Sequence, residues 1–397
     1  MKAYCSKDSF VAKFVKIILI LTIFFFLLIS QKVYAITSSV SGNWSVGATW
    51  AGGVVPGTTA VDDVTILAGH NITLDNDTNA LNSLTVTGTL TDNAAKTVTV
   101  SGGGHVEING SIRFTSNSIL NISNGGNLTI NSAGLLTQGS GAISTNDFTV
   151  NNNGAFTQGG NLTVAGNTDV TLATWTIQSG TFAPTGTVDV TGNLTISSTG
   201  TLTQGANRVT VTGNLTIDGS GGVFTANAAA TNINIGGNWS NSGTFTANGS
   251  TVVFTDADHT LNGSTTFNNF NHEVATSRTL TFESSATQTI TGLLTLKGSS
   301  GGLLNLMSDT TAAWNLNRAG TYDIDYVDVE YSNNTGTAIS VQASSNTNSG
   351  NNSGWNFTSS TSTAIPTLSE WGMIIFTILL GASAVFAIRR RDMEDSI

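Results

Sequence analysis

The chain has 397 residues, of which 10% are charged, 44 are glycine and 3 are proline. This composition argues against a disordered chain rich in proline or charge, and it is typical of a β-rich body with many tight turns. Between Ile36 and Ala364, 19 acidic residues face 6 lysines and arginines, a net charge of −13. That sign argues against binding to nucleic acid or to an anionic membrane surface.

Residues 1–35 are typical of a secretory signal peptide. An apolar run from Ile17 to Ile29 follows four lysines, and Val33 and Ala35 are small enough for signal peptidase to read; the lysines are Lys2, Lys7, Lys13 and Lys16. Thirteen helical residues span about 20 Å, too short for a hydrocarbon core of about 30 Å, so a membrane anchor is disfavoured. We predict a signal helix that is cleaved after Ala35. Cys5, the only cysteine, would leave with it, so the mature chain would hold no disulfide.

The segment 42–75 breaks the repetitive pattern, because it holds Trp44, Trp50 and Pro56. Bulky tryptophans suit a cap over the first turn of a repeat protein. The segment resembles the G8-type domains with which many exported bacterial β-helix proteins begin. Residues 236–357 resemble a second repeat of such surface proteins.

A short phrase, GNLTI or GNLTV, recurs through the body and has a relative, GNWS. Its asparagines are 34, 32, 21 and 24 residues apart: Asn127, Asn161, Asn193, Asn214 and Asn238. Within the first phrase Leu128 and Ile130 share one face while Asn127 and Thr129 share the other, which is the period of a half-buried strand. A second phrase, TQG, recurs at 137–139, 157–159 and 203–205.

Short strands, Gly and Asn turns and a repeat near 20 residues predict an all-β fold, a right-handed parallel β-solenoid. Stacked turns would bury the Leu, Ile and Val rows that a single turn leaves open. Roughly 12 turns at about 4.8 Å each would give a rod of about 55–60 Å. The alternative is an array of antiparallel β-sandwich domains, whose turns would also recur every 8–12 residues.

Because β-solenoids can host polysaccharide lyases and hydrolases, the acidic residues are candidates for catalysis or calcium binding. Asp62 and Asp63 are adjacent, so they would point to opposite faces. Asp256 and Asp258 would share a face. The densest group, a weak candidate for a metal site, is Asp323, Asp325, Asp328 and Glu330. The alternative for these acids is a solvated edge that discourages strand pairing between molecules.

The remaining candidate features favour a structural role. The four histidines, His70, His105, His259 and His272, carry no metal-binding spacing, and we predict them at the surface or in turns. Threonine pairs such as Thr85 with Thr87 and Thr97 with Thr99 would suit an ice- or crystal-binding face only if they stacked in register over many turns. We therefore predict no cofactor and no metal.

The C-terminus has a different character. Trp371 to Ile388 is an uncharged run long enough to span a membrane, and Arg389, Arg390 and Arg391 follow it. A basic cluster stays in the cytoplasm, so the body would lie outside. One interpretation of this segment is a membrane anchor that consists of a single spanning helix.

The motif before that run supports a more specific reading: Ile365, Pro366, Thr367, Leu368, Ser369, Glu370, Trp371 and Gly372. With the apolar run and the arginines it resembles the IPTL-CTERM variant of the PEP-CTERM sorting signals of Gram-negative bacteria. The resemblance implies recognition by an exosortase-type membrane enzyme, removal of the tail, and delivery to the envelope or the exterior. Asp392, Glu394 and Asp395 depart from the pattern by reducing the net charge after the arginines.

These features predict five segments. They are a signal peptide at 1–35, a cap and first turns at 36–125, solenoid repeats at 126–331, a last turn and linker at 332–364, and a sorting signal at 365–397. We expect a non-enzymatic cell-surface or matrix protein. Signal peptidase and the sorting enzyme would process it, and it would interact with exopolysaccharide or neighbouring cells. The alternative is a carbohydrate-active β-helix enzyme, which requires acids of separate turns to converge in one groove.

Overall fold

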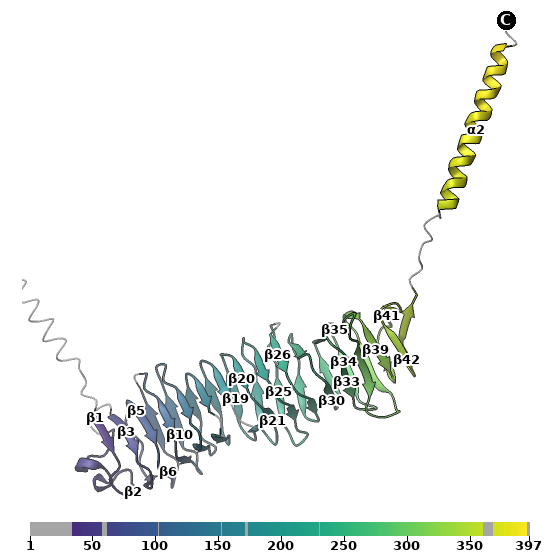
Figure 1. The fold of residues 1–397 in the computed structure, drawn as a ribbon. Helices are drawn as coiled ribbons and strands as arrows, with labels where there is room; N and C mark the ends of the chain where they lie inside the picture. The colour runs from purple at the N-terminus through teal and green to yellow at the C-terminus, as the bar shows by residue number, and fades with distance from the viewer. Residues whose placement is uncertain are drawn as a thin grey trace, which may run out of the picture.

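The computed structural model describes residues 34–57, 62–101, 103–151, 153–170, 174–229, 231–359 and 368–394. Its body is an elongated all-β solenoid of about 13 turns, close to the predicted number (Figure 1). The strand pairs of the described body are parallel, from β1 with β3 to β41 with β43. The alternative of antiparallel β-sandwiches is therefore wrong, and the right-handed coiling stays a prediction. The predicted signal helix falls on residues outside the described ranges.

Most turns contribute three strands, so the rod has three sides. Side one is a single 14-stranded sheet: β1 (Tyr34–Thr37), β3 (Asp62–Ile66), β5 (Ser83–Val86), β8 (Val106–Ile108), β11 (Leu128–Ile130), β14 (Phe148–Val150), β17 (Thr168–Val170), β20 (Val188–Val190), β23 (Val209–Val211), β26 (Asn232–Ile235), β29 (Thr251–Phe254), β32 (Asn269–Glu273), β35 (Leu293–Lys297) and β38 (Thr321–Asp325).

Side two consists of two sheets in succession. The first has six strands: β2 (Gly42–Asn43), β4 (Asn71–Leu74), β6 (Thr89–Asp92), β9 (Ser111–Arg113), β12 (Leu135–Thr137) and β15 (Ala155–Thr157). The second has nine: β18 (Thr174–Ile177), β21 (Asn193–Ile196), β24 (Leu215–Ile217), β27 (Trp239–Asn241), β30 (His259–Asn262), β33 (Arg278–Phe282), β36 (Leu304–Ser308), β39 (Val327–Glu330) and β42 (Thr347–Gly350).

Side three is also divided. Its first sheet has eight strands: β7 (Thr97–Val100), β10 (Ile119–Ile122), β13 (Ile143–Thr145), β16 (Leu162–Val164), β19 (Thr181–Pro184), β22 (Thr201–Thr203), β25 (Val223–Thr225) and β28 (Thr244–Thr246). Its second has four: β31 (Thr265–Phe267), β34 (Thr287–Ile290), β37 (Trp314–Arg318) and β40 (Ser332–Asn334). The strands β41 (Ile339–Gln342) and β43 (Trp355–Thr358) form a last pair.

One core runs along the rod, because alternate residues of all three sides point inward. Leu128 and Ile130 are fully buried while Thr129 between them is partly exposed, as the alternation predicts. Inward residues of successive turns lie in register, so Leu194, Leu215 and Trp239 stack along side two. Stacking therefore buries apolar rows that one turn cannot cover.

The recurring phrases GNLTI, GNLTV and GNWS all begin with Gly-Asn, and we refer to them together as the GN phrase. Each lies at the start of a strand, but these strands belong to different sides of the rod. The phrase at Asn127 leads into β11 on side one, the phrase at Asn161 leads into β16 on side three, and the next three lead into side two. Steps of 34 and 32 residues therefore change side, whereas steps of 21 and 24 connect stacked turns. This explains the irregular spacing.

The glycine and asparagine of the phrase have a shared physical role where they stack. The Oδ1 atom of Asn193 accepts the N–H of Asn214 at 2.8 Å, and the Oδ1 atom of Asn214 accepts the N–H of Asn238 at 2.7 Å. A Cβ on Gly237 would lie 2.5 Å from the Oδ1 atom of Asn214. The glycine thus leaves room for the asparagine beneath it, which satisfies a backbone donor at the corner of the turn.

Two tryptophans lie in the first turn, where the cap is predicted. Trp44 and Trp50 are 1% and 2% exposed, and their rings meet edge to face with centroids 4.8 Å apart. The Trp50 indole donates to the carbonyl oxygen of Trp44 at 2.8 Å. The two short 3₁₀ segments η1 (Gly47–Thr49) and η2 (Ala51–Gly53) flank Trp50. A non-repeating segment therefore brings these rings into the N-terminal end of the core.

Candidate functional site

The tail forms one helix, α2 (Leu368–Glu394), beyond the last strand of the body (Figure 1). Its segment from Glu370 to Arg391 is long and apolar enough to cross a membrane, with a mean hydropathy of 2.2, and none of it is buried against the rod. Apolar side chains such as Phe376 and Phe386 are 64% and 81% exposed. A helix with this exposed apolar surface is suited to a lipid environment and not to the core of a soluble domain.

The predicted sorting motif spans the beginning of this helix. Ile365, Pro366 and Thr367 lie outside the described residues, whereas Leu368 to Gly372 form the first turn of α2. Glu370 is the acidic residue of that first turn, and Arg391 lies in the last turn. Both charges suit the helix dipole, which favours an acid near the N-terminus and a base near the C-terminus. The helix extends past the predicted run at both ends.

The adjacent acids Asp62 and Asp63 point to opposite faces, as predicted. Asp62 is buried and accepts the N–H of Gly57 at 2.7 Å. Asp63 faces outward and accepts bonds from Asn82 at 2.7 Å and Ser83 at 2.6 Å. Both carboxylates therefore hold neighbouring backbone and side-chain donors, and they do not form a shared site.

Asp256 and Asp258 are engaged by the next turn. Asp256 forms an ion pair with Arg278 at 2.9 Å, and Asp258 accepts the N–H of Thr279 at 2.8 Å. Hydrogen bonds from the Ala275 N–H and the Arg278 guanidinium lower the pKa of Asp256. A carboxyl group held ionised in this way is poorly suited to act as a general acid near neutral pH.

A corner divides the densest acidic group between two sides of the rod. Asp323 and Asp325 belong to β38 on side one, and Asp328 and Glu330 belong to β39 on side two. Tyr326, with a φ of 53°, turns the chain between these strands. No three of the described His, Cys, Asp and Glu residues could hold a metal ion together. Three strand spacings separate β29 from β38 on side one, roughly 14 Å, so these acids and Asp256 belong to different turns.

The basic residue beside this group is Lys297, which lies in the preceding turn of side one. The Nζ atom of Lys297 lies 2.5 Å from the Oδ2 atom of Asp323, and this hydrogen bond raises the pKa of Lys297. Arg318 is buried, lies 4.7 Å over the ring of Tyr322, and donates to backbone carbonyl groups, including that of Thr337 at 3.0 Å. Register explains the difference, because β35 and β38 are neighbours in one sheet.

The prediction that all four histidines lie at the surface or in turns is wrong for two of them. His259 and His272 are 2% and 0% exposed, and their ring centroids are 5.0 Å apart. His259 contacts the carbonyl oxygens of Gly237 at 2.7 Å and Thr255 at 2.9 Å, whereas neither ring nitrogen of His272 lies within ordinary hydrogen-bond geometry of a partner among the described residues. Both residues occupy inward positions of their strands, a placement that the strand alternation could have indicated.

Lowering the pH should destabilise the rod through His272. Burial lowers the pKa of His272 to about 4, and the nearby His259 adds to the shift. Below about pH 6.5 His272 is protonated in the unfolded chain but remains neutral in the folded chain until the pH approaches 4. The free energy of unfolding therefore falls by on the order of 3 kcal/mol between pH 6.5 and pH 4. His272→Leu should remove this part of the loss, because Phe254 and Leu296 are its neighbours in register.

Urea midpoints at pH 7 and pH 4.5 measure this difference. The control is His105→Leu, which changes an exposed histidine and should keep the acid sensitivity. An equal acid-induced loss in His272→Leu and the unaltered chain would contradict the assignment.

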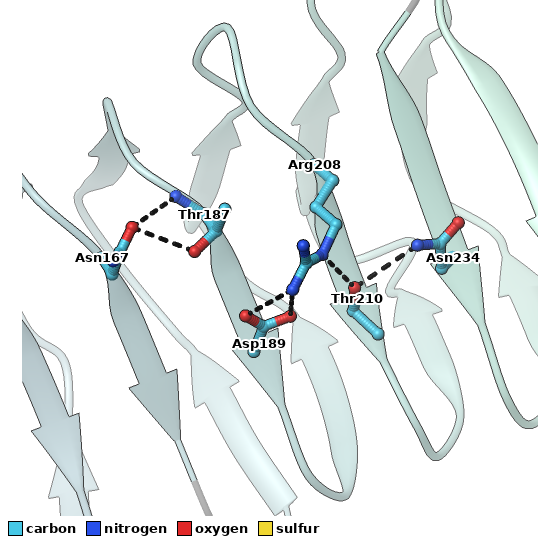
Figure 2. A network of polar contacts seen from close by, with 6 residues as sticks. All are labelled: Asn167, Thr187, Asp189, Arg208, Thr210 and Asn234. Atoms are coloured by element: carbon cyan, nitrogen blue, oxygen red, sulfur yellow. Dashed lines mark hydrogen bonds and ion pairs between the residues drawn. The ribbon is translucent and has the colours of Figure 1, made fainter.

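The outward face of side one carries polar side chains that connect successive turns (Figure 2). Arg208 donates to both carboxylate oxygens of Asp189 at 3.0 Å and to Thr210 at 3.3 Å, and Asn234 donates to Thr210 at 3.5 Å. Asn167 likewise accepts the N–H and the hydroxyl of Thr187 at 3.2 and 3.0 Å. These contacts stabilise the stack from outside the core.

Among the described strands, threonines stack in register over no more than three turns. Thr65 and Thr85 are neighbours, but Glu107 occupies the next turn. On side three, Thr97 lies beside Ile119, and Thr99 lies beside Asn121. An ice- or crystal-binding face requires a regular array, so the described registers oppose that hypothesis.

Two family models match the chain. The IPTL-CTERM motif model matches residues 363–391, and the G8 domain model matches residues 49–177. No curated protein and no solved structure matches the chain. The chain therefore carries an IPTL-CTERM motif behind a β-solenoid body that contains a G8 domain. The G8 match extends beyond the predicted segment and ends at Ile177, the last residue of β18, where the second sheet of side two begins.

Proposed function

We propose that this chain, whose sorting motif marks it as an exported surface protein, is a non-enzymatic rod that an exosortase-type membrane enzyme processes at its C-terminus. The match of residues 363–391 to the IPTL-CTERM motif carries this proposal. The apolar helix from Glu370 to Arg391 holds the precursor in the membrane, and the arginines at its end stay in the cytoplasm. The rod then lies on the outer side of the inner membrane of a Gram-negative cell.

Cleavage by signal peptidase after Ala35 is compatible with the pairing of the first strand, β1. Signal peptidase cleaves after Ala35, which removes two residues of β1 and leaves Ile36 and Thr37 paired with β3. Ile36 is 7% exposed, so the new N-terminus remains packed against the core. The mature rod extends from this residue towards the linker before the motif.

The role proposed for the mature rod is contact with exopolysaccharide or with neighbouring cells. Among the acids that an enzyme of the β-helix class would use, Asp256, Asp258 and Asp323 are engaged in contacts between turns, and this supports a structural role. The outward rows of hydroxyl, amide and carboxylate groups, such as those around Asp189 and Thr210, offer partners for sugar hydroxyls.

Deleting residues 365–397 should change where the protein goes. We expect the full-length chain to reach the envelope or medium through a membrane-bound precursor, and we expect the deleted chain never to appear in the inner-membrane fraction. Fractionation and immunoblotting in the native host measure both. Replacing Arg389, Arg390 and Arg391 by lysine is the control, because it keeps the charge that orients the helix. If the deleted chain followed the same route as the full-length chain, the sorting proposal would be wrong.

A further inference from the structure

A polar groove lies where side three changes from one sheet to the next. The eight-stranded sheet ends at β28 and the four-stranded sheet begins at β31, and these two strands do not pair. The corner segments that lead into them, residues 240–243 and 262–264, line a groove of about 560 Å³ together with Glu283 of the following turn. This volume lies within the range of about 300–1,000 Å³ that is usual for sites of small organic ligands.

One buried polar atom of this groove's lining has no partner within the described part of the chain. Asn241 is 7% exposed, and its Oδ1 atom has no hydrogen-bond partner. Its amide nitrogen donates to Thr265 at 3.2 Å, which fixes the side chain. Glu283 accepts the N–H of Gly263 through Oε2 at 2.6 Å, so this bond leaves its second oxygen available. The Oδ1 atom of Asn241 lies on the inward side of β27 and is out of reach of a ligand, whereas the second carboxylate oxygen of Glu283 can accept a bond from a ligand in the groove.

The chemistry of the lining selects the class of ligand. Serine, asparagine and one glutamate offer both donors and acceptors, and the lining contains no lysine, arginine or apolar side chain. A phosphate or nucleic acid would lack a cation, and a hydrophobic ligand would lack an apolar wall. A calcium ion would find one carboxylate, fewer than such sites generally use. A neutral sugar, whose hydroxyl groups both donate and accept, matches the lining.

We infer that this groove binds a short segment of a neutral glycan, with Glu283 accepting bonds from its hydroxyl groups. The inference deepens the proposed contact with exopolysaccharide and gives it a place on the rod. The outward position of Asn262, at the end of β30, puts an amide beside the same groove. The net negative charge of the body disfavours binding of an acidic polysaccharide and does not affect binding of a neutral one.

Affinity electrophoresis of the mature exported protein tests the inference, in gels that contain dextran, a soluble β-glucan or galactomannan, with polygalacturonate as the acidic polymer. We expect retardation in at least one neutral gel, none by polygalacturonate, and no change when EDTA is added. Glu283→Gln keeps an acceptor for Gly263 and exchanges the second oxygen for a donor. It should weaken the apparent affinity about tenfold, because a hydrogen bond to a charged acceptor is stronger than one to a neutral amide. Asn262→Trp should block the groove to a similar extent.

The matched control is Glu273→Gln, which removes an exposed carboxylate on side one, away from the groove, and should leave retardation unchanged. Equal urea midpoints of the variants show that they fold alike. The inference is overturned if no neutral polymer retards the protein, if EDTA abolishes retardation, or if the groove variants behave like the control. None of these results bears on export, because the Glu283 and Asn262 variants keep the signal and the tail.

Discussion

Replacing Leu294 by alanine should destabilise the rod by about 2–5 kcal/mol. Leu294 is 2% exposed and lies in β35, between Phe270 of the turn before and Tyr322 of the turn after. Truncating it removes apolar contacts and leaves a cavity that rigid neighbouring turns cannot close. Urea unfolding of the body without residues 365–397 measures the loss as a lower midpoint.

The neighbouring Leu293 provides a matched control. It has the same side chain in the same strand, but it is 41% exposed because alternate residues face outward. Leu293→Ala should change the stability by no more than about 0.5 kcal/mol. Equal losses at the two positions would mean that β35 does not have the described inward and outward faces, and they would contradict the solenoid register.

Replacing Gly237 by alanine should destabilise the rod by about 1–3 kcal/mol, even though the change adds one methyl group at a corner. The new Cβ would lie 2.5 Å from the Oδ1 atom of Asn214 and 2.6 Å from the carbonyl carbon of Gly213. Something must move, and the bond from the Asn238 N–H to Asn214 is the contact most directly displaced. The urea midpoint of the same body measures this effect.

The control for this change is Gly301→Ala, because no atom lies within 4 Å of a Cβ at that position. Its φ is not in the left-handed region, so alanine should cost nothing there and should slightly reduce the entropy of the unfolded chain. If Gly237→Ala were as stable as Gly301→Ala, the stacking of glycine over asparagine would not explain the GN phrase.

The sequence was sufficient to predict the class of fold, because strand alternation is a local signal. Leu128 and Ile130 are buried on either side of Thr129, as their period requires. The arrangement of turns was harder to predict, since the same GN phrase precedes strands on all three sides. The steps of 34 and 32 residues could not be separated from the stacking steps without the pairing of β11, β16 and β21 with their neighbours.

Sites that depend on neighbouring turns could not be predicted from the sequence. Lys297 and Asp323 are 26 positions apart, and only the pairing of β35 with β38 brings them together. The inward position of His272 follows from its alternation with Asn271 and Glu273, but its contact with His259, 13 positions earlier, depends on how the turns stack. The groove at Glu283 lies where the sheet that ends at β28 is followed by the sheet that begins at β31, and no sequence motif indicates this change of sheet.

In the proposed function this chain is an exported rod whose two ends are removed, and the intact mass of the protein recovered from envelope and medium tests that proposal most directly. We predict a chain that begins at Ile36 and ends near the sorting motif, without the helix from Glu370 to Arg391. A recovered chain that still carries this helix and Arg389 to Arg391 would contradict the claim.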